Sequence, residues 1–282
     1  MYPVMKWALV PLLLLLCLIT GSLLALLFQV TPALLTQLIT DPEFHFAVLM
    51  SLATSLTSLV LAFLIAVPAA WVMVRGDFPG KRVADALFDI PLVTPPLVIG
   101  IGLLLLLGSQ GPLAGIFPQL GRWLFSPVGV IIAQTYVASA VLYRSAQGAF
   151  ASVDPAYVRT AMNLGLTPGK TLLLAEIPLC LQGLLSGGIL AYSRALGEFG
   201  ATLMLAGATR FKTETLPMAI YLNIASGDFS LALGCALILM ALAIVLLVAL
   251  HRLKRQPSVL CSGCEMLPPP SGSLPLWRYA YR

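Results

Sequence analysis

The most constraining feature of this sequence is a series of long apolar segments. A helix needs about 20 predominantly apolar residues to cross the hydrocarbon core of a bilayer. Only 10% of the 282 residues are charged, whereas soluble domains carry about 25%. The sequence therefore predicts an all-α, polytopic membrane helix bundle with six transmembrane helices, at residues 7–28, 46–74, 87–107, 127–143, 177–196 and 229–250.

The first apolar segment, residues 7–28, could also be read as a signal peptide. It exceeds the roughly 7–15 apolar residues of a signal-peptide core, and no clear small-x-small cleavage site follows it. We therefore expect a true span. The shorter apolar stretch at residues 203–206 is expected to dip into the membrane without crossing it.

Lys and Arg are distributed unevenly between the predicted loops. Cytoplasmic loops of membrane proteins carry an excess of these residues. Twelve of the 16 fall in loops and tail on one side, three fall on the other side, and Arg194 lies within the fifth span. This bias predicts a multi-pass membrane protein with both termini in the cytoplasm, and it explains the net charge of +5 without nucleic-acid binding.

Prolines interrupt the third predicted span. Proline removes a backbone donor and blocks the preceding turn, so Pro91 and the run Thr94-Pro95-Pro96 predict a bent or broken helix. Lipid excludes unsatisfied backbone groups, so the break is expected to face protein or a water-filled cavity. For any single proline, a packing kink is the alternative.

The five cysteines form no pattern typical of a disulfide framework. Cys261 and Cys264 form a lone C-x-x-C, whereas a structural zinc site takes four ligands. We predict no metal site and no cofactor. Residues 256–282 contain Pro268-Pro269-Pro270 and are expected to form a flexible cytoplasmic tail.

The most informative loop lies between the fourth and fifth spans. Asp154 suits the N-cap of a helix, Pro155 its first position, and Gly165 the left-handed residue that ends it. The helix between them has about ten residues, too few to be stable alone in water. It must therefore pack against something, either the groove of a partner or, as an ordinary amphipathic connector, its own bundle.

This loop resembles the "EAA" loop of binding-protein-dependent ABC importer permeases, whose signature is E-A-A, a later glycine and I-x-L-P. Arg159-Thr160-Ala161 takes the E-A-A position, Gly165 the glycine, and Ala175-Glu176-Ile177-Pro178 the last part, with Arg159 in place of the glutamate. The resemblance implies a docking helix for an ATPase, with the coupling residues Asp154, Pro155, Arg159, Thr160, Ala161, Gly165 and Pro178.

The chain carries no complete phosphate-binding loop. Gly169-Lys170-Thr171 is similar to the end of one, but Leu164 stands where the motif needs its first glycine. We therefore expect no catalytic residues in this chain and ATP hydrolysis by a separate subunit.

Two ionisable residues lie at the end of the fifth span. Arg194 and Glu198 are four apart, so on a continuous helix they share a face and can pair. Ionisable residues in a span mark function by default, and Gly197 and Gly200 loosen the backbone beside them. A gate that lets a delivered ion pass and a structural ion pair both explain this pattern.

The stretch R-A-L-G-E-F-G-A-T-L-M-L-A-G at residues 194–207, together with F-P-G-K and the proline run within residues 77–96, resembles molybdate importer permeases. The resemblance covers residues 40–255. It implies a type I ABC importer permease of the bacterial inner membrane that carries a tetrahedral oxyanion, with molybdate favoured and sulfate, thiosulfate and tungstate as alternatives. The implied pathway residues are Thr94, Pro95, Pro96, Arg194, Gly197, Glu198, Gly200 and Thr202.

The resemblance also implies an assembly. The permease would form a homodimer in membrane lipid, with two copies of an ABC ATPase and a periplasmic or extracellular oxyanion-binding protein. Residues 1–40 would form an extra transmembrane helix and periplasmic loop, 41–255 the permease domain, and 256–282 the tail. Two other classes stay open: a secondary ion-coupled transporter with Arg194 and Glu198 as a relay, and a non-transporting assembly factor.

Overall fold

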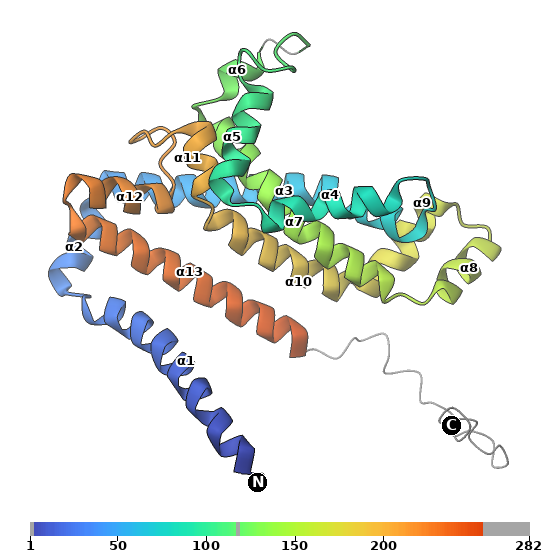
Figure 1. The fold of residues 1–282 in the computed structure, drawn as a ribbon, viewed down its shortest axis with the longest axis horizontal. Coiled ribbons are helices and arrows are strands. Elements are labelled where there is room, and N and C mark those ends of the chain that lie inside the picture. The colour runs from blue at the N-terminus through green and yellow to red at the C-terminus, as the bar shows by residue number, and fades with distance from the viewer. Residues whose placement is uncertain (1–2, 117–118, 256–282) are drawn as a thin grey trace.

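The computed structural model describes residues 3–116 and 119–255, and within these ranges every regular element is a helix. The long helices α3, α7, α10 and α13 run along the length of an elongated bundle, and α5, α6 and α11 project from one side of it (Figure 1). The elements are α1 (Pro3–Phe28), α2 (Pro32–Thr40), α3 (Pro42–Arg75), α4 (Lys81–Val93), α5 (Pro96–Leu107), α6 (Leu120–Trp123), α7 (Pro127–Ala151), α8 (Pro155–Asn163), α9 (Pro168–Thr171), the π-helix η1 (Leu172–Glu176), α10 (Ile177–Leu196), α11 (Gly200–Ala206), α12 (Leu216–Ser226) and α13 (Phe229–Arg255).

The predicted spans correspond to five continuous apolar helices and one broken pair. Within the described residues, the continuous ones are Leu9–Phe28, Pro42–Arg75, Pro127–Ala151, Pro168–Leu196 and Phe229–Leu253. The third predicted span is two helices, α4 and α5, bent by 117°. The predicted break is therefore confirmed, and a single straight helix over residues 87–107 is excluded. Pro91 lies inside α4, so the break falls at Thr94-Pro95.

Hydropathy set the end of the fourth span too early, at residue 143. In the structure α7 continues to Ala151. The added turns begin with Arg144, which donates to the carboxylates of Asp85 and Asp89 on α4. Gln147 also donates to Asp85. These polar residues lower the hydropathy of the segment, and they also bind α4 to α7. No residue of α4 is buried within this chain.

Small residues let α3, α7 and α10 approach each other closely. The main core contains Ala62, Ala66 and Ala70 of α3, and it continues through alanines of α7. A Cβ added to Gly183 of α10 would lie 2.7 Å from the Cβ of Ala149 on α7. Close packing of small residues is the main source of helix association in lipid, where no hydrophobic force draws helices together.

The helices α2 and α12 were not predicted, because they have only 9 and 11 residues. They cover the opposite end of the bundle from α8, where they enclose a second core with the start of α3 and with α13 (Figure 1). The helix α1 lies apart from this bundle, and its apolar window is not buried at all within the chain. Such a surface is suited to lipid or to another membrane-embedded protein.

A buried polar cluster lies at the α2–α12 end. Arg210 pairs with Glu43 at 3.3 Å, and the Asn223 amide donates to Glu43 at 2.9 Å. The neighbouring carboxyl of Glu214 is buried and accepts one bond, from the Phe211 N–H at 3.1 Å, while its Oε1 has no partner among the described residues. Burial, followed by the proximity of Glu43, raises the pKa of Glu214 to about 7.

This pKa predicts a pH-dependent stability. The usual carboxyl value is 4.5, so between pH 4.5 and 7 the folded chain holds a proton that the unfolded chain has lost. The stabilisation is complete below pH 4.5 and is lost as the pH rises through 7. Glu214→Gln should flatten this decline, because the neutral amide can replace the protonated acid. Thermal unfolding in detergent between pH 5 and pH 8 measures it.

Asp77→Asn is the control for this prediction, since Asp77 is an exposed carboxyl away from the cluster. It should keep the pH dependence of the parent. An unchanged decline in Glu214→Gln would show that another group causes it.

Candidate functional site

The residues predicted as pathway and those predicted as coupling residues form two separate groups. The pathway group lies where α4 meets α5 and where α10 meets α11, along the body of the bundle (Figure 1). The coupling group lies at one end, on α8 and the turns that lead into α10. Each group is described in turn.

The fifth span is followed by a short break in the helix, and a side chain within the break caps the start of the next helix. The helix α10 ends at Leu196, and α11 begins at Gly200 after a short connection. The Glu198 carboxylate accepts a 2.9 Å bond from the Ala201 N–H and so satisfies a free donor at the start of α11. The break is therefore stabilised by its own side chain at a position with no access to water, because Glu198 is fully buried.

The predicted pairing of Arg194 with Glu198 is confirmed. The guanidinium Nη1 lies 2.8 Å from Oε2 of Glu198. The two partners differ in environment, because the Arg194 side chain is 40% exposed and that of Glu198 is 0% exposed. The carboxylate is thus paired with the guanidinium through one oxygen, which balances its charge, and hydrogen-bonded to a backbone amide through the other. An anion nearby would meet little net repulsion from it.

The two breaks lie against each other. A Cβ on Gly200 would lie 2.9 Å from the Cβ of Pro96, at the start of α5. One turn later, Gly100 packs onto the backbone of Ala201, where an added Cβ would lie 2.9 Å from its carbonyl oxygen. Glycine at these positions lets α5 and α11 run in direct contact. The structure therefore brings Pro96 and Gly200, predicted from distant parts of the sequence, into one site.

The remaining pathway residues surround this contact. Thr94 ends α4, with its N–H donated to the Ile90 carbonyl at 2.9 Å. Pro95 has no N–H to satisfy at the bend. Thr202 is fully buried on α11, and its hydroxyl has no partner among the described residues. A polar atom in such a place is suited to a water or a polar solute.

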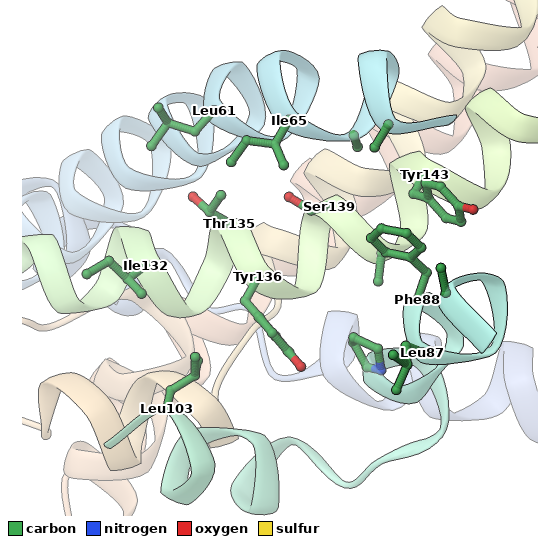
Figure 2. Close-up of a pocket in the computed structure, with 15 residues that line it drawn as sticks. Leu61, Ile65, Leu87, Phe88, Leu103, Ile132, Thr135, Tyr136, Ser139 and Tyr143 are labelled. Atoms are coloured by element: carbon green, nitrogen blue, oxygen red, sulfur yellow. The ribbon is translucent and has the colours of Figure 1, made fainter. Parts of the chain in front are cut away.

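An apolar groove of about 660 Å³ lies between α3, α4, α5 and α7 (Figure 2). Its walls include Leu61 and Ile65 of α3, Phe88 of α4 and Leu103 of α5. Two buried hydroxyls on α7 belong to the same lining and lack partners among the described residues, those of Thr135 and Ser139. Sequence reasoning missed this groove, because its lining comes from four helices.

The helix α8, predicted to dock an ATPase, has the predicted capped form. The Asp154 carboxylate accepts a 2.8 Å bond from the Ala156 N–H, and Pro155 takes the first helical position. At the other end Gly165 has φ +91°. The Gly165 N–H donates to the Met162 carbonyl and the Leu166 N–H to that of Ala161, the Schellman arrangement. Both ends of the nine-residue helix α8 are thus fixed locally.

One face of α8 is held by the chain, and the other is open. Ala161 is buried, whereas Arg159 and Thr160 are exposed. Large apolar side chains on the open face are Tyr157 at 58% exposure, Met162 at 46% and Leu164 at 80%. Pro178 lies in the first turn of α10 and is also exposed. An exposed apolar face on a short, rigid helix is suited to insertion in a groove of another protein.

Sequence reasoning missed the ion pairs of Arg75 and Arg144, because it used the Lys and Arg residues of the loops only to orient the chain in the membrane. Arg75 pairs with Glu176 at 2.8 Å. The available signal was a carboxylate within an apolar stretch, since Glu176 lies between Ala175 and Ile177. Within the described residues there is no group of three metal-ligating side chains. Cys261 and Cys264, like the rest of the predicted tail, lie outside the described residues.

These features define a class of protein: a polytopic membrane transport subunit, with one broken span packed against the short helix α11 and a capped helix in its loop. Residues 58–256 match the family described as "Binding-protein-dependent transport system inner membrane component". The chain belongs to this family, and it is a multi-pass inner-membrane permease.

Individual relatives cover most of the chain. The molybdenum transport system permease protein ModB of Mycobacterium tuberculosis is 36% identical over 86% of this chain and 92% of that protein. The protein of the same name from Escherichia coli K12 is 33% identical, over 78% and 96%.

Two solved structures share the fold. A bacterial alginate ABC transporter, crystallised with an alginate pentasaccharide-bound periplasmic protein, has a TM-score of 0.70 at 16% identity, over 89% of this chain and 94% of that one. The MetNI methionine ABC transporter has a TM-score of 0.56 at 15% identity, over 80% and 100%. The predicted type I ABC permease fold is confirmed by these likenesses.

The Arg194–Glu198 pair yields a prediction on stability. Arg194→Gln should destabilise the protein by about 2–3 kcal/mol, below the roughly 3–5 kcal/mol of a fully buried pair because Arg194 is half exposed. Glu198→Gln should cost less, since its amide oxygen can still accept from Ala201 and Arg194 can reach water. Thermal unfolding of the two variants in detergent gives the order.

A charge swap, Arg194→Glu with Glu198→Arg, is the matching test. It should not restore stability, because an arginine at position 198 cannot accept the bond that starts α11. Recovery in the swapped variant would mean that only the charge pair matters.

Proposed function

We propose that this chain is the permease subunit of an ATP-driven importer that carries molybdate across the inner membrane. The observation that supports it most is identity of 33–36% to molybdenum permeases over more than three quarters of the chain. The capped helix α8, with its exposed apolar side chains, supports the ATP-driven mechanism. Sulfate, thiosulfate and tungstate are the alternative cargoes, since they are also tetrahedral dianions.

The coupling group would connect the permease to its ATPase. Two ATPase subunits would dock on α8 of two permease copies, through the exposed side chains Tyr157, Met162 and Leu164. Closure of the ATPases on ATP would draw the two α8 helices together and turn the pathway outward. Hydrolysis in the ATPase would return it inward. ATP drives this cycle because it binds one of the two states more tightly.

The pathway group would act as a gate for a delivered anion. A binding protein outside the membrane would select the oxyanion and release it between the permease copies. Because the charge of Glu198 is compensated by Arg194 and the Ala201 N–H, the gate would neither hold an anion tightly nor repel it strongly. The breaks at Thr94-Pro95 and Gly197–Phe199 would be the points at which the helices move.

A second copy of the chain would complete the assembly. The groove of Figure 2 is apolar and open, and it offers a contact for that copy. Residues 41–255 would form the permease domain, with residues 1–40 as an added span and loop and 256–282 as a tail. Two observations support this division: α1 is not buried against the rest of the chain, and the family match starts at residue 58. Both termini would lie in the cytoplasm, as the Lys and Arg bias requires.

Disruption of α8 tests the docking. Asp154→Ala combined with Gly165→Val should detach the ATPase, because it removes an N-cap worth about 1 kcal/mol and places a β-branched residue at positive φ. Co-purification of the ATPase with the tagged permease measures this. Gly169→Ala, in the same loop with open space around it, is the control and should keep the ATPase. Full attachment in the double variant would refute the docking.

Transport of the proposed cargo is tested in proteoliposomes with permease, ATPase and binding protein. Molybdate and tungstate, but not sulfate, should stimulate ATP hydrolysis and uptake. Stimulation by sulfate alone would keep the mechanism and overturn the cargo. Uptake that follows a proton gradient, with no ATPase bound, would favour a secondary transporter, and no substrate-dependent activity of any kind would favour an assembly factor.

A further inference from the structure

Three side chains meet at the α8 end of the bundle, beside the coupling group. The carboxylate of Glu176 is 1% exposed and receives two bonds. The indole Nε1 of Trp71 donates to Oε1 at 3.0 Å, and Nε of Arg75 donates to Oε2 at 2.8 Å. Trp71 and Arg75 are one turn apart near the end of α3, so they present their donors on the same face.

Arg75 makes two further bonds, both to the chain that enters α8. Its Nη2 donates to the carbonyls of Phe150 and Val153, each at 3.3 Å. Phe150 lies in the last turn of α7, and Val153 directly precedes the N-cap Asp154. The last carbonyls of a helix have no partner within it. One guanidinium therefore links the end of α3, the start of the coupling loop and the carboxylate before α10.

This arrangement needs an arginine. The planar guanidinium holds its donors in a fixed fork, so that Nε can face Glu176 while Nη2 faces the two carbonyls. A lysine ammonium would neutralise the carboxylate as a point charge, yet it could not hold the same set of bonds in a fixed geometry. The groups that Arg75 binds are buried, since Phe150 is fully buried and Val153 nearly so, while the Arg75 side chain is 19% exposed.

The carboxylate partner lies at an irregular point of the backbone. Glu176 is the last residue of the π-helix η1, and the next N–H, of Ile177, donates to the Leu172 carbonyl. Such π turns occur mostly as single insertions and frequently at functional sites. The helix α10 continues from here without a break to Leu196, next to the Arg194–Glu198 pair.

We propose that Arg75 is the positioning residue that fixes the coupling helix α8 on the membrane bundle, and that Glu176 and Trp71 orient it for this task. The proposal rests on the docking of an ATPase to α8 proposed above. A shift of α8 would act through Val153 and Arg75 on α3, and through Glu176 on α10, which leads to the break beside α5. The coupling thus passes through named contacts rather than through the whole bundle.

The competing explanation is that Arg75 only neutralises a buried carboxylate. Arg75→Lys separates the two explanations, because it keeps the positive charge beside Glu176 and gives up the bridge to the carbonyls. Arg82→Gln is the matched control, since it removes an exposed cation from the nearby start of α4.

The first measurement needs no ATPase. In a variant whose native cysteines are replaced by serine, spin labels at Tyr157→Cys on α8 and Leu181→Cys on α10 report the distance between the two helices. Both positions are exposed, at 58% and 47%. The parent and Arg82→Gln should give one narrow distribution. Arg75→Lys should give a broad one, while the detergent-solubilised protein stays monodisperse.

The second measurement uses unlabelled variants in proteoliposomes with the ATPase and binding protein. Arg75→Lys should hydrolyse ATP but move about 3- to 10-fold fewer substrate molecules per ATP than the parent. Should Arg75→Lys fail to fold, Glu176→Gln takes its place, because it keeps an acceptor for Trp71 and weakens only the hold on Arg75. The same broadening and loss of coupling are expected.

The outcomes separate this proposal from the one on which it rests. A distribution as narrow as that of the parent, with unchanged transport per ATP, would overturn the positioning role and leave Arg75 as a charge partner of Glu176. If no ATPase binds the parent permease, the docking proposal fails. A broad distribution in Arg75→Lys would then still assign to Arg75 the task of fixing α8.

Discussion

Lipid offers no hydrogen bonds, so every backbone group within the membrane must find a partner in the protein. This constraint explains why the break between α4 and α5 lies against the break between α10 and α11. At one break a proline, Pro95, has no N–H to satisfy; at the other, the Glu198 carboxylate accepts from the Ala201 N–H. Gly200 and Gly100 then let α5 and α11 cover each other. The contact between α5 and α11 makes these breaks tolerable in a membrane.

The same constraint acts at the α8 end through charged groups. Arg75 satisfies carbonyls at the end of α7 and holds Glu176, and Arg144 holds α4 through Asp85 and Asp89. Both guanidiniums reach across to other elements, Arg75 from the last residue of α3 and Arg144 from the C-terminal half of α7. Because Glu176 is buried, its charge-assisted bond to Arg75 is strong, and leaving that carboxylate unpaired would be costly. The short helices of the loops thus have a fixed place although they bury little apolar surface themselves.

Sequence reasoning succeeded where the deciding interaction is local. The capped ends of α8 follow from Asp154, Pro155 and Gly165, all within or next to the helix. The Arg194–Glu198 pair follows from a spacing of four. The predicted end of the fourth span was less accurate, because Arg144 and Gln147 lower the hydropathy of α7 without ending the helix. The short helices α2 and α12 were missed because their stability comes from packing on α3 and α13.

The sequence by itself determined the apolar spans, the place of the proline break and the capped helix, because each depends on residues a few positions apart. Only the tertiary structure decided the contact of Pro96 with Gly200, the groove between four helices, and the link from Arg75 to Glu176. These partners are far apart along the chain, since Glu176 comes 101 positions after Arg75. The packing of the helices decides which charged residues pair with each other, and no local spacing encodes that choice.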